Sequence, residues 1–337
     1  MVEVHDPRGA FRDEAMPELA AALDPVTAQR ELSSRLGSTL GGPLTLRAIS
    51  VVRHKPGRRC LIRYDTSIEG DDGPVTLSML GKVRVQRYGK SGWRRLRAFR
   101  DAGFDDDAVD LIGMPEPIGT VPALHMWLQR LVDGRALTQL LDDPRGQELA
   151  ARAAEAANKI HGAGVPTEKD HTVQDELTIL HDRLAAAAVS RPDLAARIGR
   201  LAEAAAETAR PLRDRPTAGI HRDYYADQVL VGDDGWIHVV DLDLYCRGDP
   251  GVDIGNFLAH VTEQSLRTWG DPRRLRAVED AFRERFLELA GDGHADAVDA
   301  YADLTLARHI WLSTVIEGRA HATGALVALC EERFGLD

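Results

Sequence analysis

Residues 219–260 read GIHRDYYADQVLVGDDGWIHVVDLDLYCRGDPGVDIGNFLAH, the most informative stretch of the sequence. Two short apolar runs, at 228–231 and 236–240, are separated by the turn-forming residues GDDG. β-Branched and aromatic residues on both sides of a Gly- and Asp-rich turn are typical of a β-hairpin. The stretch therefore predicts a polar loop, then a hairpin, and then a helix that begins near residue 253.

Three oxygen-bearing side chains lie at one end of the predicted hairpin. Asp223 and Gln228 precede or open its first strand, and Asp241 follows its second strand. Two carboxylates and an amide oxygen suit a hard divalent cation, and Mg²⁺ takes few protein ligands and leaves room for substrate phosphates. Asp223 is then expected to accept or orient the proton of an incoming hydroxyl group.

The order and spacing of these residues resemble the aminoglycoside phosphotransferase and choline kinase family of small-molecule kinases. That family has the pattern H-x-D-x-x-x-x-N, a hydrophobic hairpin, an Asp, and then G-D-P-x-x-D. The matching residues here are His221, Asp223, Gln228, Asp241 and the run from Gly248 to Asp253. Gln228 departs from the family's Asn, because it keeps the amide oxygen but adds one methylene.

The resemblance implies an α+β fold of the bilobal, protein-kinase-like kind. It divides the chain into an N-terminal helical segment (1–40), a β-rich nucleotide-binding lobe (41–131) and a helical catalytic and acceptor-binding lobe (132–337). It also implies transfer of the γ-phosphoryl group of ATP to a small-molecule hydroxyl. In that reaction Asp223, flanked by His221 and Arg222, is the catalytic base, and Gln228 and Asp241 hold Mg²⁺.

Composition is that of an ordinary soluble globular protein with two sizeable cores. The sequence contains no run of about 18 apolar residues, so no membrane span is predicted. The N-terminal segment is acidic, unlike that of a signal peptide. The three cysteines (Cys60, Cys246, Cys330) are far apart and form no CxxC motif. Reduced cysteines and a cytoplasmic location are therefore expected.

The net charge of −11 is unevenly distributed. Residues 41–100 hold fourteen Lys or Arg against four Asp or Glu, a net charge of +10, which leaves −21 for the rest. This split fits a basic lobe that binds an anionic nucleotide and an acidic lobe that binds a neutral or cationic acceptor. Solvated charged faces are the plain alternative. Few aromatic residues and no nucleic-acid motif speak against a nucleic-acid partner.

The first half of the chain predicts helices in residues 12–38 and then an antiparallel meander. Its strands are expected at 44–52, 59–64 and 75–85, with turns at 54–58 and 70–73. In the family the first turn covers the nucleotide phosphates. Here Gly57, Arg58 and Arg59 would bind them through backbone amides and guanidinium groups, although a Pro-Gly turn with arginines also forms without any ligand.

Lys82 in the third strand matches the family's lysine that contacts the α- and β-phosphates, and Arg84 on the same strand face is the competing candidate. In kinases a glutamate on the following helix pairs with this lysine. The helix expected at 92–101 is strongly basic, and no carboxylate occurs between Asp72 and Asp101. The usual Lys–Glu pair is therefore missing, or its acid comes from elsewhere.

The segment that joins the two lobes is expected to contact the adenine through backbone groups around Gln129 to Leu131. Helices follow at 147–162, 176–189, 194–208, 273–290, 295–314 and 318–334. Asp253 is expected to hydrogen-bond backbone amides of the catalytic loop, and His161 to pack or to cap a helix. Acids of the C-terminal lobe are candidates for lining an acceptor pocket: Glu263, Asp303, Glu317, Glu331 and Glu332.

Two other functions fit parts of the sequence. A protein kinase is disfavoured because only eleven residues separate Asp241 from Asp253, too few for an activation segment. A nucleotide-binding pseudokinase with weak or no phosphotransfer stays open because of Gln228 and the missing glutamate. The acceptor stays open between an aminoglycoside-like antibiotic, a sugar and an amino alcohol, and the oligomeric state between a monomer and a homodimer.

Overall fold

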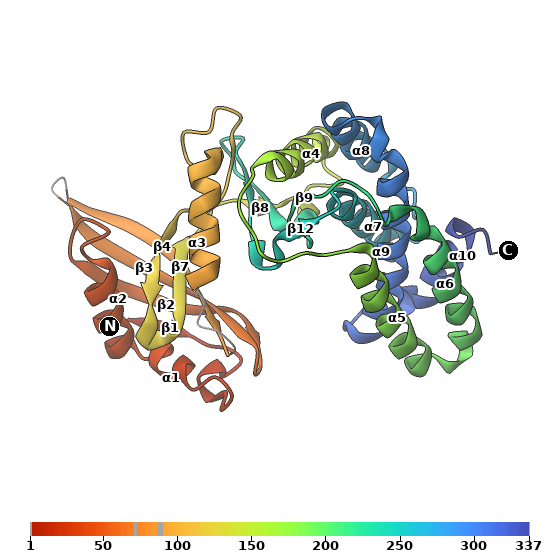
Figure 1. Cartoon of the computed structure of the whole chain (residues 1–337). Coiled ribbons are helices and arrows are strands. Elements are labelled where there is room, and N and C mark those ends of the chain that lie inside the picture. The colour runs from red at the N-terminus through yellow and green to blue at the C-terminus, as the bar shows by residue number, and fades with distance from the viewer. Residues whose placement is uncertain (1, 71–72, 86–89, 337) are drawn as a thin grey trace. The chain divides into compact units, whose positions relative to one another are not determined.

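A computed structural model describes residues 2–70, 73–85 and 90–336. The chain forms two compact units, Met1–Asp133 and Gly134–Asp337. A β-rich unit precedes a helical one (Figure 1), as expected for an α+β protein. None of the helices in the described ranges has the length and apolarity that a membrane crossing requires.

The N-terminal unit is built on a six-stranded sheet with the order β1-β2-β3-β4-β7-β6. The strands are β1 Glu3–His5, β2 Leu44–Lys55, β3 Arg59–Gly70, β4 Gly73–Arg84, β6 Pro117–Val121 and β7 Met126–Arg130. All neighbours pair antiparallel except β1 and β2. The predicted meander is confirmed, although residues 71–72 of its second turn lie outside the described residues.

Three helices accompany this sheet: α1 Glu18–Leu23, α2 Pro25–Leu36 and α3 Lys90–Phe99. The side chain of Asp24 caps α2 by accepting from the backbone N–H of Thr27, and Pro25 occupies the first helical position. Leu residues of α1 and α2 share one buried core with the apolar residues of β2, β3 and β4. One or two amphipathic helices were predicted in 12–38, and the structure has two.

The helix predicted at 92–101 is present, and it leads into a wide turn. α3 stops at Phe99, and residues Arg100–Phe104 form a single wide turn in which Gly103 has a φ of 93°. Only glycine adopts such a φ without strain, so the backbone reverses there. The ring of Phe104 then packs edge-on against Phe99, with 5.4 Å between the centroids.

The C-terminal unit contains the predicted hairpin and six of the predicted helical segments. Its strands are β8 Arg135–Ala136, β9 Ala218–Ile220, β10 Val229–Val231, β11 Ile237–Val239 and β12 Cys246–Gly248, and the short β5 Ile112–Gly113 precedes this unit. Its helices are α4 Gly146–Gly162, α5 Val173–Ser190, α6 Ala195–Thr208, α7 Gly251–Trp269, α8 Arg276–Ala290, α9 Ala295–Val315 and α10 Thr323–Arg333.

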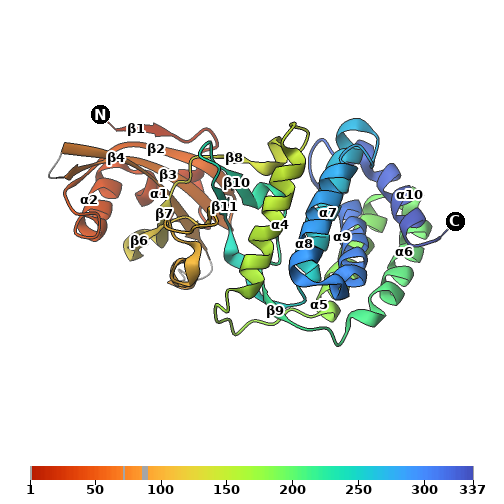
Figure 2. The same ribbon diagram turned by 90° about the horizontal axis from the view of Figure 1, so that it is seen from above.

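Helix α4 packs against α8, and α7 packs against α9 (Figure 2). Gly255 makes the second contact possible, because a Cβ at this position would lie 2.5 Å from the backbone nitrogen of Ala302. A larger residue would push the two helices apart. The tight α7–α9 contact fixes the first turns of α7, which carry Asp253 and Asn256.

Candidate active site

The loop before the hairpin, residues 221–228, is attached to the hairpin through Val240. The N–H of Val240 donates to the carbonyl oxygen of Gln228 at 3.0 Å. Its carbonyl oxygen lies 2.9 Å from Nε2 of His221. A carbonyl only accepts, so Nε2 carries the proton and Nδ1 accepts from the N–H of Asp223 at 3.3 Å. One residue thus connects both ends of this catalytic loop to the strand that leads to Asp241.

The carboxylate of Asp253 holds the backbone of the catalytic loop. Its carboxylate accepts from the backbone N–H of His221 at 2.8 Å and from that of Arg222 at 2.6 Å. The ring of His161 adds a third contact to this carboxylate at 2.9 Å. Asp253 is fully buried, so these bonds replace its hydration. The predicted structural role of Asp253 is confirmed, and His161 is a partner of this carboxylate.

The polar residues of the catalytic loop differ in their exposure. Asp223 and Asp241 are half-exposed, whereas Gln228 is only 7% exposed and His221 is fully buried. Both ring nitrogens of His221 contact backbone atoms, Nε2 the carbonyl oxygen of Val240 and Nδ1 the N–H of Asp223. Arg222, with φ 70°, and Asp241, with φ 63°, have left-handed backbone. Such strain is tolerated where the surroundings fix the conformation, as they do at functional sites.

The donor set at the end of the hairpin fits Mg²⁺. Gln228 and Asp241 bring an amide oxygen and a carboxylate to the same end of the paired strands, because Val229 pairs with Val239. Both are hard oxygen donors. In the described part of the chain no group of three or more His, Cys, Asp or Glu side chains is arranged to hold a metal ion. A two-ligand Mg²⁺ site would thus depend on further oxygen ligands from substrate and water.

Asn256 and Arg308 form a second set of contacts that supports the catalytic loop. The sequence pattern did not reveal these contacts. Asn256 donates from Nδ2 to the carbonyl oxygen of Tyr224 at 2.9 Å. Arg308 of α9 donates to Oδ1 of Asn256 at 2.7 Å and lies 3.3 Å from Glu176 of α5. The signal available in the sequence was Asn256 itself, three residues after Asp253 and therefore on the same face of one helix.

Tyr225, the next residue of the loop, stacks on the ring of His260 with 4.3 Å between centroids. His260 in turn contacts the edge of His309 at 4.4 Å. Burial lowers the pKa of His260 to about 3, and nearby arginines lower it further in the same direction. Burial also holds the pKa of His309 well below its usual value. Both rings are therefore neutral and extend the apolar support of the loop.

The turn between β2 and β3 is held by the N-terminal segment. Gly57, with φ 62°, donates its N–H to Oδ2 of Asp13 at 2.8 Å. His54 approaches the same oxygen at 2.8 Å. The hydrogen bond from Gly57 is the main reason why the pKa of Asp13 lies below its usual value. The amide predicted to bind phosphate is thus already used, whereas the side chain of Arg58 is exposed and that of Arg59 half-exposed.

Lys82 lies on β4 opposite Trp127 of β7, and its Nζ is 5.1 Å from the centre of the indole ring. Arg84 follows at the end of the same strand. In the segment after β7, the N–H of Leu131 donates to the carbonyl oxygen of Ser78 at 2.9 Å. Gln129 pairs with strands on both sides. An adenine contact at Leu131 would therefore use its carbonyl oxygen.

Residues 85–301, well over half of the chain, match the model of the phosphotransferase enzyme family (APH). The chain belongs to this family. It is therefore a small-molecule phosphotransferase that acts on hydroxyl groups. No curated protein sequence matches this phosphotransferase.

Solved structures of small-molecule kinases share the fold of this phosphotransferase. A thermostable mutant of aminoglycoside phosphotransferase APH(4)-Ia has a TM-score of 0.58 at 15% identity, with 91% of this chain and 98% of that chain covered. A choline/ethanolamine kinase family protein from Mesorhizobium loti has a TM-score of 0.54 at 16% identity, covering 94% and 93%. A glucosamine kinase has a TM-score of 0.53 at 16% identity, covering 91% and 98%.

The acids predicted to line an acceptor pocket of this phosphotransferase are mostly paired with arginines. Glu263 is 3% exposed and lies 2.8 Å from Arg267 and 3.5 Å from Arg319. Further pairs join Glu331 to Arg197 and Arg200, Asp303 to Arg333, and Glu332 to Arg273. Glu317 is exposed. Four of the five predicted acids therefore have an arginine partner.

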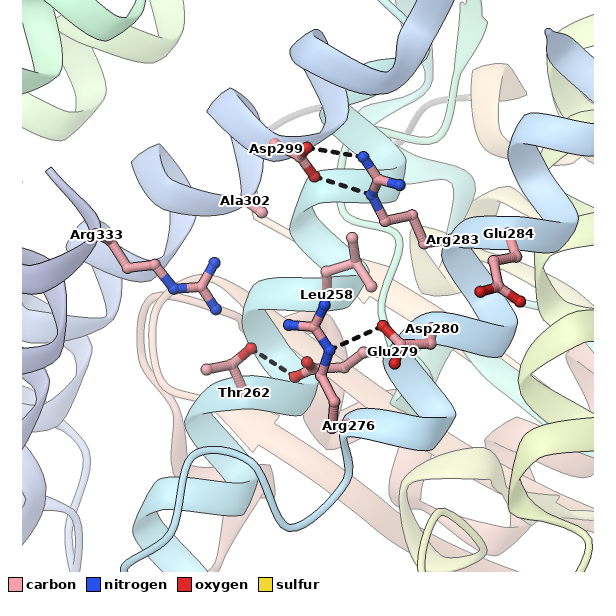
Figure 3. Close-up of a pocket in the computed structure, with 10 residues that line it drawn as sticks. All are labelled: Leu258, Thr262, Arg276, Glu279, Asp280, Arg283, Glu284, Asp299, Ala302 and Arg333. Atoms are coloured by element: carbon pink, nitrogen blue, oxygen red, sulfur yellow. Dashed lines mark hydrogen bonds and ion pairs between the residues drawn. The ribbon is translucent and has the colours of Figure 1, made fainter. Parts of the chain in front are cut away.

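A pocket of about 530 Å³ lies among α7, α8, α9 and α10 of the phosphotransferase (Figure 3). Figure 3 shows Glu279 beside the hydroxyl of Thr262, which donates to it at 2.6 Å, and the ion pair of Arg283 with Asp299. Burial raises the pKa of Glu279 to about 7. No residue predicted for the active site lines this pocket, so it is separate from the catalytic loop.

Proposed function

We propose that this phosphotransferase moves the γ-phosphoryl group of ATP to a hydroxyl of a small, polyhydroxylated molecule. The observation that supports the proposal is the attachment of the catalytic loop to the hairpin through Val240, because it keeps Asp223, Gln228 and Asp241 in one rigid unit. Phosphoryl transfer needs little covalent chemistry from the protein and depends on positioning and electrostatics.

Asp223 is proposed to accept a hydrogen bond from the acceptor hydroxyl and to take its proton as the oxygen–phosphorus bond forms. Its half-exposed carboxylate is reachable by a substrate, whereas the fully buried His221 is not. His221 and Asp253 instead fix the backbone on both sides of Arg222. Arg222 contributes positive charge next to the reacting group.

Gln228 and Asp241 are proposed to hold Mg²⁺ against the phosphates of ATP. The ion, when bound, offsets the negative charge of the phosphates. Gln228 reaches one methylene further than the Asn of the family pattern, and its burial restricts the freedom of that longer side chain. Both side chains therefore offer oxygen ligands from a fixed backbone.

In the N-terminal unit Lys82 is proposed to contact the phosphates, assisted by the guanidinium groups of Arg58 and Arg59. Charge-assisted contacts from these side chains replace the backbone amide of Gly57, which Asp13 occupies. The adenine is proposed to contact backbone groups of the segment from Gln129 to Leu131.

The acceptor is proposed to be a sugar or an amino alcohol that carries little positive charge. The arginine pairs of Glu263, Asp303 and Glu331 support a weakly charged acceptor over a polycationic aminoglycoside. Among the similar folds, one structure holds glucosamine, ADP and inorganic phosphate, and another, a spectinomycin phosphotransferase, holds ADP and spectinomycin. Both ligands are hydroxylated rings with few amino groups, which is the chemistry proposed here.

The test is ADP release from Mg-ATP with a panel of sugars, amino sugars, amino alcohols and aminocyclitol and aminoglycoside antibiotics, with Asp223→Asn as the blank. Turnover with a weakly charged acceptor that disappears in the variant is expected. Turnover only with polycationic aminoglycosides would overturn the acceptor class. Absence of both turnover and Mg-dependent ATP binding would overturn the proposed function.

A further inference from the structure

The lysine expected to contact the nucleotide phosphates lies against an aromatic ring. Lys82 of β4 and Trp127 of β7 are direct partners in the register of the two strands. The ammonium nitrogen is 5.1 Å from the centre of the indole ring, within the range of a cation–π interaction. Both residues are only 7% exposed. Removal of water strengthens this attraction, because the ring then does not compete with bulk solvent for the ammonium group.

Helix α3 is shaped to accept this ring. Its third residue is Gly92, and a Cβ built there would lie 3.1 Å from three atoms of the Trp127 indole. That distance is shorter than ordinary van der Waals contact, so a side chain at this position would displace the ring or the helix. The helix backbone therefore fixes where the indole lies, and the indole lies beside Lys82.

The same helix is where a kinase carries the glutamate that holds this lysine in place. Between Asp72 and Asp101 the sequence contains no carboxylate, so α3 itself offers none to Lys82. A helix carboxylate would neutralise the ammonium group as well as position it. An indole face attracts the ammonium group through its quadrupole and adds no charge of its own.

We propose that the Trp127 indole is a positioning group for Lys82. The inference rests on the proposed function, in which Lys82 contacts the phosphates of ATP. Trp127 itself touches no reacting atom. It lowers the freedom of the lysine side chain, so that less entropy is lost when the phosphates bind.

The experiment measures the affinity for ATP by calorimetry, with and without Mg²⁺, together with the KM for ATP and kcat. Trp127→Leu removes the π face and is expected to weaken ATP binding about 10-fold and to raise KM accordingly. Trp127→Phe keeps an aromatic face and is expected to lose only about two- to threefold. Thermal unfolding of each variant shows whether the fold survives.

Trp93 provides a matched control on the same helix. Its ring lies 5.8 Å from the guanidinium carbon of Arg97, whereas Lys82 lies over the ring of Trp127. Trp93→Leu therefore removes a tryptophan and a cation–π pair of α3 and is expected to leave ATP affinity unchanged. An equal loss in Trp93→Leu and Trp127→Leu would mean that packing of α3, and not the position of Lys82, sets the affinity.

Fluorination of the tryptophan rings tests the same contact with almost no change in side-chain shape. Progressive fluorination of the tryptophans weakens the negative face of the ring while its size is nearly kept, so ATP affinity should fall stepwise with fluorine number. In the Trp127→Phe background the same fluorination of the other tryptophans should have no effect. A flat series in the unsubstituted protein would overturn the proposal, even if Trp127→Leu does not fold.

Lys82→Ala separates this inference from the proposed function. If Lys82→Ala leaves ATP affinity unchanged, Lys82 is not the phosphate contact and the proposed function itself is wrong at this residue. If Lys82→Ala weakens binding but both Trp127 variants bind as tightly as the unsubstituted protein, only the positioning role is wrong. We expect Lys82→Ala and Trp127→Leu each to weaken ATP binding. The double variant should bind ATP no more weakly than Lys82→Ala alone.

Discussion

The carboxylate of Asp253 accepts a 2.6 Å hydrogen bond from the backbone N–H of Arg222, a residue whose φ is 70°. The left-handed conformation of a non-glycine residue costs on the order of 1 kcal/mol or more. Asp253 offsets this cost with bonds to two consecutive amides. The position of Asp223, one residue later, therefore depends on a carboxylate thirty residues further along the chain.

Asp253→Ala is expected to lower kcat at least 100-fold and the free energy of unfolding by about 3 kcal/mol, because the amides of His221 and Arg222 lose their charged acceptor. Asp233→Ala, at an exposed acid of the hairpin turn, is the control and should change neither. Kinetics and denaturant unfolding measure both quantities. Unchanged kcat in Asp253→Ala would mean that the catalytic loop keeps its conformation without this carboxylate.

Asp223→Asn is expected to reduce kcat by a factor of about 1000 or more, because an amide cannot take the hydroxyl proton. ATP affinity should change by less than about twofold, and the melting temperature by only a few degrees. The reason is that the side chain of Asp223 is half-exposed and that Asn is similar to Asp in size. Asp227→Asn, at an exposed acid of the same loop, serves as the comparison. A loss of ATP affinity in Asp223→Asn would assign this residue to nucleotide binding instead.

Asp241→Asn and Gln228→Asn should differ in their dependence on Mg²⁺. Asp241→Asn removes the charged ligand, and the Mg²⁺ concentration at half-maximal ATP binding is expected to rise at least 10-fold. Gln228→Asn keeps the amide oxygen and restores the residue of the family pattern, so a change of at most about threefold is expected. A titration of ATP binding with Mg²⁺ measures both. Equal Mg²⁺ dependence in all three proteins would place the metal ligands elsewhere.

Asp13→Ala is expected to destabilise the turn between β2 and β3 by about 2 kcal/mol, because Gly57 and His54 lose a charged hydrogen-bond acceptor. The pKa of Asp13 is lowered, so its contribution is present above the usual value of 3.8 and is lost as pH falls through the lowered value. Glu14→Ala, at the exposed neighbour, is the control. Hydrogen exchange of the Gly57 amide reports the turn directly and should accelerate only in Asp13→Ala.

Glu279 is expected to make the protein less stable as pH rises. Its pKa is raised from 4.5 to about 7, so between these values the folded state keeps a proton that the unfolded state has lost. Stability therefore falls with rising pH across this window. Glu279→Gln removes this dependence. The free energy of unfolding of the variant minus that of the unsubstituted protein should therefore grow by roughly 2 kcal/mol from about pH 5 to about pH 8.

Urea unfolding of both proteins across this pH range measures the Glu279 effect. The neutral, buried His260 and His309 change stability with pH in the opposite direction, but they do so equally in both proteins and cancel in the difference. A pH-independent difference between the two proteins would mean that Glu279 is ionised in the folded state.

The sequence by itself determined the elements and the order of the residues that carry chemistry. Alternating apolar residues predicted the meander of β2, β3 and β4, and the GDDG turn predicted the hairpin of β10 and β11, because both patterns depend on neighbouring residues only. The role of Asp253 was also predictable, since the family pattern that contains it fixes its distance from His221 along the chain.

The hydrogen-bond, ion-pair and cation–π partners of these residues could be identified from the tertiary structure alone. Asp13 is forty-four residues from Gly57, Trp127 is forty-five from Lys82, and Arg308 is fifty-two from Asn256. No local pattern encodes such pairs, because they arise when strands and helices with different registers pack against each other. The arginine partners of Glu263 and Glu331, which shift the proposed acceptor toward weak charge, became visible for the same reason.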